Sequence, residues 1–182
     1  MRIALTVGHS LLKNGCYTSA DGRKKGGCLE YSWCKAFSKQ VKSALDRKGH
    51  KVDLIICPEK KFSSSGQERS YKLSLINSKK YDLLVELHLN ASDNPKANGT
   101  EVLYKTDYGK KYAASVEKEL SKVFKSRGAK QTDKLYILNC TKSVAILIET
   151  FFCTSPDDYK KAKGLEKRTK IAKLVADGID SV

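Results

Sequence analysis

The sequence of 182 residues has little proline, no long apolar run and no closely spaced cysteine pair. Its 3 prolines and 12 glycines are too few for a collagen-like or linker chain, and a hydrophobic content of 40% excludes a disordered one. No apolar run approaches the roughly 18 residues of a membrane span, so no span is expected. At roughly 100–200 residues per domain, the length predicts one domain, whose core needs no disulfide staples.

None of the 6 cysteines lies in a CxxC pair, the spacing typical of zinc knuckles and redox motifs. Cys57 and Cys153 end apolar runs, where a free cysteine behaves as a small hydrophobe. We therefore expect reduced, structural thiols. A cysteine peptidase is an alternative, but neither Cys16 nor Cys28 stands in a sequence context typical of a nucleophile.

The first residues also lack the features of a secretory signal. Only Ile3, Ala4 and Leu5 are apolar between Arg2 and Thr6, whereas such a signal needs an apolar stretch of about 7–15 residues. We therefore expect synthesis in the cytoplasm without a signal peptide.

Acidic residues are in the minority, with 20 Asp+Glu against 35 Lys+Arg and a net charge of +15. Such a charge suits a polyanionic partner, and nucleic acid is one candidate. The lysines are scattered along predicted helices, however, with no stacked aromatic motif and no helix-turn-helix signature. We expect no nucleic-acid binding and keep a basic nucleic-acid-binding domain as an alternative.

Alternating strand and helix patterns predict an α/β protein. Apolar residues four apart, such as Leu29, Trp33 and Phe37, predict a helix that ends near Gly49. The predicted strands are Arg2–Val7, Lys51–Cys57, Asp82–Leu89, Thr100–Tyr104, Leu135–Leu138 and Ser143–Phe151. The other predicted helices are Gln67–Lys80, Tyr108–Lys125, one that starts at Ser155, and Ile171–Ile179. Because most of the strands are almost continuously apolar, helices should cover both faces of the sheet.

Four residues that bind metals or transfer protons fall at the ends of predicted elements. His9 follows the first strand, His88 ends the third, Glu149 ends the last, and Glu30 begins the first long helix. Ligands of open α/β sheets bind outside the carboxyl ends of the strands, which places these side chains in one region. Two imidazoles and one carboxylate make a catalytic zinc set, and a further carboxylate can take a proton from the attacking water. The sequence has no HExxH motif, so the spacing alone leaves a structural role open for each residue.

Glu149 and Glu86 are carboxylates inside runs that should be fully buried. An ionised carboxylate there is costly unless it is paired or binds a metal. Glu86, His88 and Asn90 alternate along one strand and therefore share a face. This face is a second reason to expect a site here.

Five segments occur in the order of the motifs of a known enzyme family. They are TVGHS (6–10), CLEYSWC (28–34), ELHLNAS (86–92), GTEVLY (99–104) and AILIET (145–150). The chain resembles the zinc-dependent N-acetylmuramoyl-L-alanine amidases, and within them the catalytic domains of clostridial bacteriophage endolysins. The resemblance runs from about Arg2 to the final helix.

The resemblance implies a catalytic domain with a mixed, roughly six-stranded twisted sheet and helices on both faces. Family endolysins often carry a separate wall-binding domain, but 182 residues leave no room for one, so we expect one catalytic domain over residues 1–182. It implies that His9, Glu30 and His88 bind one zinc per chain and that Glu149 is the catalytic carboxylate. The implied reaction lyses the cell wall by cleaving the amide bond between N-acetylmuramic acid and the L-alanine of the stem peptide. A zinc-activated water attacks, and a glutamate is the general base.

Other enzymes fit the same residues. A zinc peptidase or another wall amidohydrolase on this scaffold is the alternative, whereas a binding module with a degenerate site is disfavoured because all four site residues are present. Glu86 departs from the family, which commonly has a small or hydroxyl residue there. We expect Glu86 to support a metal ligand from behind, with an extra base or a buried bystander as alternatives, and Asn90 to contact substrate.

The implied partners are bacterial peptidoglycan and the anionic polymers of the wall, which suit the positive charge. We expect a monomer that is made in the cytoplasm and reaches the wall through a phage-made membrane lesion.

Overall fold

Six strands form one mixed sheet in the computed structural model, which describes residues 1–182. The strands are β1 (Arg2–Val7), β2 (Lys51–Ile55), β3 (Leu83–Asn90), β4 (Thr100–Tyr104), β5 (Ser126–Gln131) and β6 (Val144–Phe152). Their order across the sheet is β2-β1-β3-β6-β4-β5. β2, β1, β3 and β6 run parallel, whereas β4 pairs antiparallel with β6 and parallel with β5. The predicted α/β class with a mixed, six-stranded sheet is confirmed.

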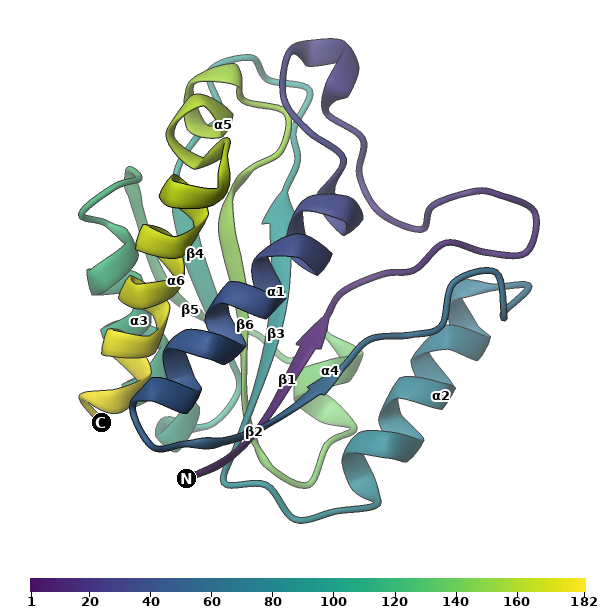
Figure 1. Ribbon diagram of the computed structural model, residues 1–182, viewed down its shortest axis with the longest axis vertical. Helices are drawn as coiled ribbons and strands as arrows, with labels where there is room; N and C mark the ends of the chain where they lie inside the picture. Colours follow the sequence, from purple (N-terminus) through teal and green to yellow (C-terminus); the bar gives the residue numbers. More distant parts are fainter.

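Helices cover both faces of this sheet (Figure 1). They are η1 (Arg23–Lys25), α1 (Glu30–Arg47), α2 (Ser65–Asn77), α3 (Asp107–Leu120), α4 (Tyr136–Asn139), α5 (Pro156–Ala162) and α6 (Leu165–Asp180). Helices α1, α3 and α6 pack on one face, α2 and α4 lie on the other, and α5 lies beyond the carboxyl end of β6 (Figure 1). No helix combines the length and the apolar character that a membrane crossing requires.

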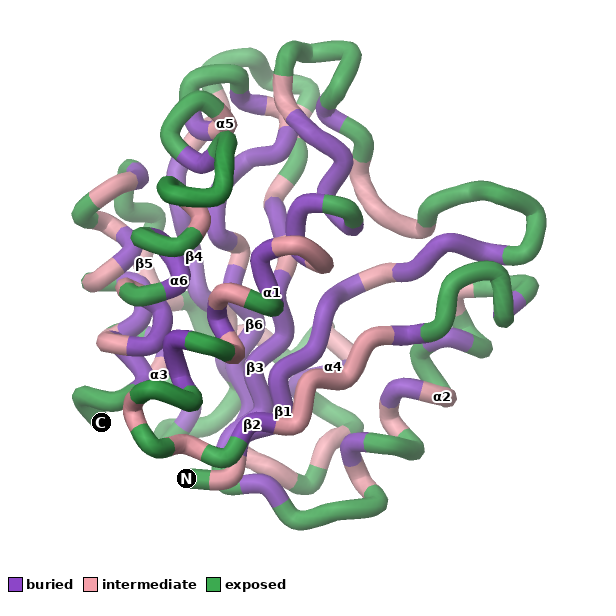
Figure 2. The backbone as a smooth tube through the Cα atoms, viewed as in Figure 1, coloured by how far each residue is buried: buried purple, intermediate pink, exposed green.

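The core follows from these layers, because the central strands are buried on both faces (Figure 2). The larger apolar cluster lies between the sheet and α1, α3 and α6, and it includes Trp33, Phe37 and Phe151. The smaller cluster lies under α2 and α4 and includes Ile76 and Leu147. The near-continuous apolar runs of β1, β3 and β6 are therefore required by two packed faces.

The expected start of a helix at Ser155 is confirmed. The Ser155 hydroxyl accepts a hydrogen bond from the Asp158 backbone N–H, and Pro156 occupies the first turn of α5. The last helix begins at Leu165, earlier than expected. Its first turns carry no apolar pattern before Ile171, so the periodicity of the sequence did not reveal this start.

Two predictions about secondary structure are wrong. The apolar run Leu135–Leu138 is not a strand, because it caps and then forms most of the short helix α4. In a run this short, periodicity does not distinguish a strand from a helix. The strand β5 was not expected, because SRGAKQ has no alternating apolar residues. It is an edge strand, and Arg127 and Lys130 on it form ion pairs with Glu101 of β4.

Candidate metal centre and active site

The strand order brings the predicted site residues together. β3 lies between β1 and β6, and all three run parallel, so their carboxyl ends meet at one edge of the sheet. His88 on β3 is the direct register partner of Glu149 on β6, and His9 follows β1 on the other side. Glu30 is the first residue of α1, which starts at this same edge (Figure 1). All four predicted residues therefore converge.

Three of the four form a cluster of possible metal ligands. Donor atoms of His9, Glu30 and His88 all lie within 4.8 Å of one another. Glu30 Oε1 lies 3.3 Å from Nε2 of His9 and 3.0 Å from Nδ1 of His88. In a tetrahedral site with metal–ligand distances of about 2.0–2.1 Å, neighbouring ligand atoms are about 3.3–3.4 Å apart. The donor set therefore fits zinc, and the two distances from Glu30 are close to this ligand spacing.

The backbone before the cluster makes room for it. Gly8 has its N–H bonded to the Leu87 carbonyl, and a Cβ at this position would lie 2.7 Å from Nδ1 of His88 and closer still to other atoms of the ring. His9 itself is in the left-handed region, with φ of 66°. A non-glycine residue seldom adopts this conformation, and such outliers concentrate at functional sites.

Glu30 is held in place by backbone donors on two sides. Its Oε1 accepts from the Leu89 N–H of β3, and its Oε2 accepts from the Ala20 N–H of the loop between β1 and α1. Burial alone would raise the pKa of Glu30, but hydrogen bonds from His88 and His9 keep it well below its usual range. The Glu30 side chain is therefore a fixed, ionised carboxylate.

His88 lies between two carboxylates, one at each ring nitrogen. Nδ1 faces Glu30, whereas Nε2 lies 2.9 Å from Oε1 of Glu86. Burial alone would lower the pKa of His88, but the hydrogen bonds to Glu30 and Glu86 raise it to about 10. A metal-binding histidine commonly donates its second N–H to a carboxylate, which orients the ring. Glu86 lies at the second nitrogen of His88, and its predicted support of a metal ligand stays a prediction.

Glu149 differs from the other carboxylates because nothing binds its side chain. Its Oε2 is buried and has no hydrogen-bond partner. Burial raises the pKa of Glu149 to about 7, against the opposing effect of His88. Its side chain lines a cavity of about 250 Å³ together with His9, Glu86, His88 and Tyr136. A free carboxylate beside a metal-binding cluster is the arrangement that a general base requires.

Comparisons with known proteins agree with this geometry. The sequence profile of the N-acetylmuramoyl-L-alanine amidases (Amidase_3) matches residues 3–181. The chain belongs to this amidase family. The expectation of an enzyme of the N-acetylmuramoyl-L-alanine amidase class is thereby confirmed, whereas the individual roles of the site residues stay predictions.

Two solved structures and one further amidase are similar to this chain. The catalytic domain of the CD27L endolysin, described as targeting Clostridia Difficile, is 49% identical, with a TM-score of 0.92 over 98% of this chain and 96% of that chain. The amidase AmiC2 of Nostoc punctiforme is 25% identical, with a TM-score of 0.80 over 98% of this chain and 94% of that chain. The amidase LytC of Bacillus subtilis (strain 168) is 32% identical over 118 residues, which are 62% of this chain but only 23% of LytC.

Asn90 of the amidase does not line the cavity beside Glu149. Its side-chain amide donates a hydrogen bond to Oε1 of Glu101. The other oxygen of Glu101, Oε2, accepts hydrogen bonds from Arg127 and Lys130. Asn90 is half-buried two residues beyond His88. Its predicted contact with substrate therefore stays a prediction, and it requires that the amide keep a polar atom available beside the Glu101 bond.

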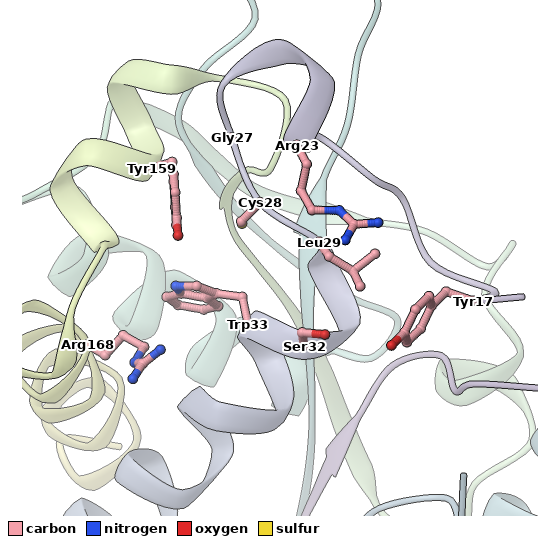
Figure 3. A pocket seen from close by; sticks show the side chains of 9 residues that line it. All are labelled: Tyr17, Arg23, Gly27, Cys28, Leu29, Ser32, Trp33, Tyr159 and Arg168. Carbon is pink, nitrogen blue, oxygen red and sulfur yellow. The ribbon is translucent and has the colours of Figure 1, made fainter. Parts of the chain in front are cut away.

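A second cavity of the amidase, of about 360 Å³, lies on the outer side of the start of α1 (Figure 3). Leu29, Ser32 and Trp33 of the α1 region line it, with Tyr159 and Arg168 on the opposite side. The Arg23 guanidinium at its rim is paired with Asp21 and is not free for another anion. None of the four predicted site residues lines this cavity, so the reaction centre belongs to the smaller one.

The cysteines of the amidase are all free thiols. Burial raises the pKa of Cys28 and Cys153 to about 12 and that of Cys57 to about 11. A thiolate is the nucleophilic form, so these thiols are unreactive near neutral pH. The expectation of structural thiols holds for them, and the cysteine peptidase alternative gains no support.

Sequence analysis did not single out two residues that contact the site. One is Gly8, which follows the first strand and leaves room for the His88 ring. The other is Lys72 of α2, whose side chain is 1% exposed and bonded to Glu86. The expected burial of Glu86 was a usable signal, since a buried carboxylate calls for a cation, but the sequence does not say which lysine supplies it.

Proposed function

We propose that the chain cleaves the amide bond between N-acetylmuramic acid and L-alanine in peptidoglycan, with one zinc held by His9, Glu30 and His88. The observation that carries this proposal is the convergence of these donors beside the Glu149 carboxylate, whose Oε2 is buried without a hydrogen-bond partner. Family membership supports the bond that is cut. A bound zinc would supply an activated water nucleophile and polarise the scissile carbonyl.

The residues of the chain divide the remaining work. His9 and His88 line the cavity, and Glu30 completes the metal-binding set beside them. Backbone donors hold Glu30, and Glu86 holds the ring of His88. Glu149 accepts a proton on its carboxylate, since no hydrogen bond occupies this side chain, and returns it to the leaving amine. The cavity limits water around these groups, which strengthens their electrostatic effect.

The partner of this site is the bacterial cell wall. We propose that the net charge of +15 draws the chain to the anionic polymers of the wall, and that the chain acts as a monomer. The likeness to an endolysin catalytic domain supports action on the wall from inside the host, after passage through a phage-made membrane lesion.

Metal content and product chemistry test the proposal. The purified protein should contain about one zinc, and His9→Ala or His88→Ala should abolish both zinc binding and wall lysis. His50→Ala is the matched control, because His50 contacts the N-terminus and Asp180 and lies outside the cluster. Full lytic activity after exhaustive chelation would refute the proposal that the reaction depends on bound zinc.

The bond is tested on digested wall. Amide cleavage should release a free amino group on L-alanine and no new reducing sugar end. Reducing ends that increase in step with lysis would identify a glycosidase and refute the assignment. Cleavage of a peptide bond within the stem would identify the zinc peptidase alternative.

A further inference from the structure

A buried lysine lies behind the candidate metal centre, and its role goes beyond the roles assigned above. The Nζ atom of Lys72 donates to Oε2 of Glu86 at 2.9 Å and to the Val7 carbonyl at 2.7 Å. The side chains of Lys72 and Glu86 are each 1% exposed. Lys72 therefore connects α2 to the two strands that lead into His9 and His88.

We propose that Lys72 is a positioning residue for the metal ligand His88, acting through Glu86. This inference rests on the proposed function. Three consecutive contacts connect Lys72 to the ligand cluster: Lys72 Nζ to Glu86 Oε2, Glu86 Oε1 to His88 Nε2, and His88 Nδ1 to Glu30. Because the ammonium group has donors only, it engages one oxygen of Glu86 and turns the other toward the imidazole.

The consequence for His88 is a fixed tautomer. A carboxylate oxygen is only an acceptor, so Nε2 must carry the proton that it receives. Once the ring has lost its second proton to bind a metal, its lone pair lies on Nδ1, which is the nitrogen facing Glu30. A ring with its lone pair on the right nitrogen and its plane held in advance binds a metal more tightly.

Charge balance favours the same role. Glu30, Glu86 and Glu149 bring three carboxylates to one region, one more than a divalent ion neutralises. Lys72 is the cation that contacts this group from the protein side. Burying an ion pair does not by itself stabilise a fold, so the burial of Lys72 is explained better by the site than by stability.

The test is the zinc dissociation constant of the full chain, measured by competition with a chromophoric chelator. Glu86→Gln should weaken zinc binding by about 10–100-fold. The amide oxygen would stay with Lys72 and its NH2 group would face Nε2, which forces the ring proton onto Nδ1, the wrong nitrogen. Adding Lys72→Met should recover part of the lost affinity, because the amide is then free to turn its oxygen toward His88.

This recovery is a result that a merely structural lysine would not produce. If Glu86→Gln binds zinc as tightly as the natural chain, or if the added Lys72→Met brings no gain, the inference is wrong. Should Glu86→Gln alone fail to fold, the double variant, which replaces both charges of the buried Lys72–Glu86 pair, is compared directly with the natural chain. It should bind zinc about 10-fold more weakly, since a neutral amide polarises the ring less, and equal affinity would overturn the inference.

Two controls separate the possible failures. Ile76→Ala also removes buried contacts of α2, but Ile76 is apolar and cannot hold the Glu86 carboxylate by a hydrogen bond, so the affinity for zinc should not change. Long-range 1H–15N NMR of the zinc-loaded protein should show a protonated Nε2 on His88. If the natural chain binds no zinc at all, the proposed function fails. If the natural chain binds zinc but Glu86→Gln and the double variant bind it with unchanged affinity, this inference alone fails.

Discussion

Replacing Gly8 with alanine puts a methyl group where the His88 ring lies. The backbone of Gly8 is outside the left-handed region, so an alanine is acceptable there apart from the overlap with His88. A Cβ would lie 2.7 Å from Nδ1 and closer to the neighbouring ring atoms, whereas carbon contacts are comfortable at about 3.5–4.0 Å. The ring must therefore move by about 1 Å or more.

Such a shift is large on the scale of a metal site. Ligand distances are expected to hold within about 0.2 Å, and a misplacement of about 1 Å costs about 100-fold in rate. We expect Gly8→Ala to lose zinc on gel filtration and to lyse walls at least about 100-fold more slowly, while the chain still folds. Zinc content by mass spectrometry, lysis by turbidity and thermal unfolding measure the three effects.

A second glycine provides the control. A Cβ on Gly66 would meet only the Ser64 hydroxyl oxygen, at 3.8 Å, which is an ordinary contact. Gly66→Ala in α2 should therefore leave zinc content and activity unchanged and keep or raise stability. Gly8→Ala with natural zinc content and activity would refute the argument that this glycine exists to admit the His88 ring.

Three other outcomes are expected. Glu149→Gln should lower activity by about 100-fold or more with zinc retained, because it removes the base but keeps the shape; loss of zinc instead would mean that the roles of Glu149 and Glu30 are exchanged. Hydrogen bonds from Tyr81, Lys79 and Arg2 lower the pKa of Asp53 from 3.8 to about 2, so its stabilisation is present above the unfolded value and is lost as pH falls toward 2. After allowance for solvent exposure, the lowered pKa of Asp53 corresponds to about 1 kcal/mol of unfolding free energy. Urea unfolding should show that Asp53→Asn is less stable than the natural chain by that amount at pH 7 and about equally stable near pH 2. A stability difference that stays constant with pH would contradict this prediction. Lysis of whole cells should fall steeply with salt, whereas cleavage of a small soluble muropeptide should change little; parallel salt curves would leave the charge without a role in wall association.

Local pattern alone determined much of the fold. The apolar runs of β1, β3 and β6, the spacing of four in α1 and the cap at Ser155 are properties of neighbouring residues, and each was predictable for that reason. Where a local pattern was weak, prediction failed. The polar edge strand β5 and the short helix α4 owe their conformation to the partners they pack against.

The chemistry of the site was also readable in the sequence, because His9, His88 and the two glutamates follow apolar runs or begin a helix. Only the tertiary structure decided how they meet. The order β1-β3-β6 places their strand ends side by side, and long-range pairing of this kind leaves no trace in local periodicity. The contact of Gly8 with His88 and the pairing of Lys72 with Glu86 join residues far apart in the chain or on different elements. Such contacts depend on the packing of whole elements, and this is why a glycine that looks like a strand end and a lysine on a helix acquire roles that the sequence by itself does not show.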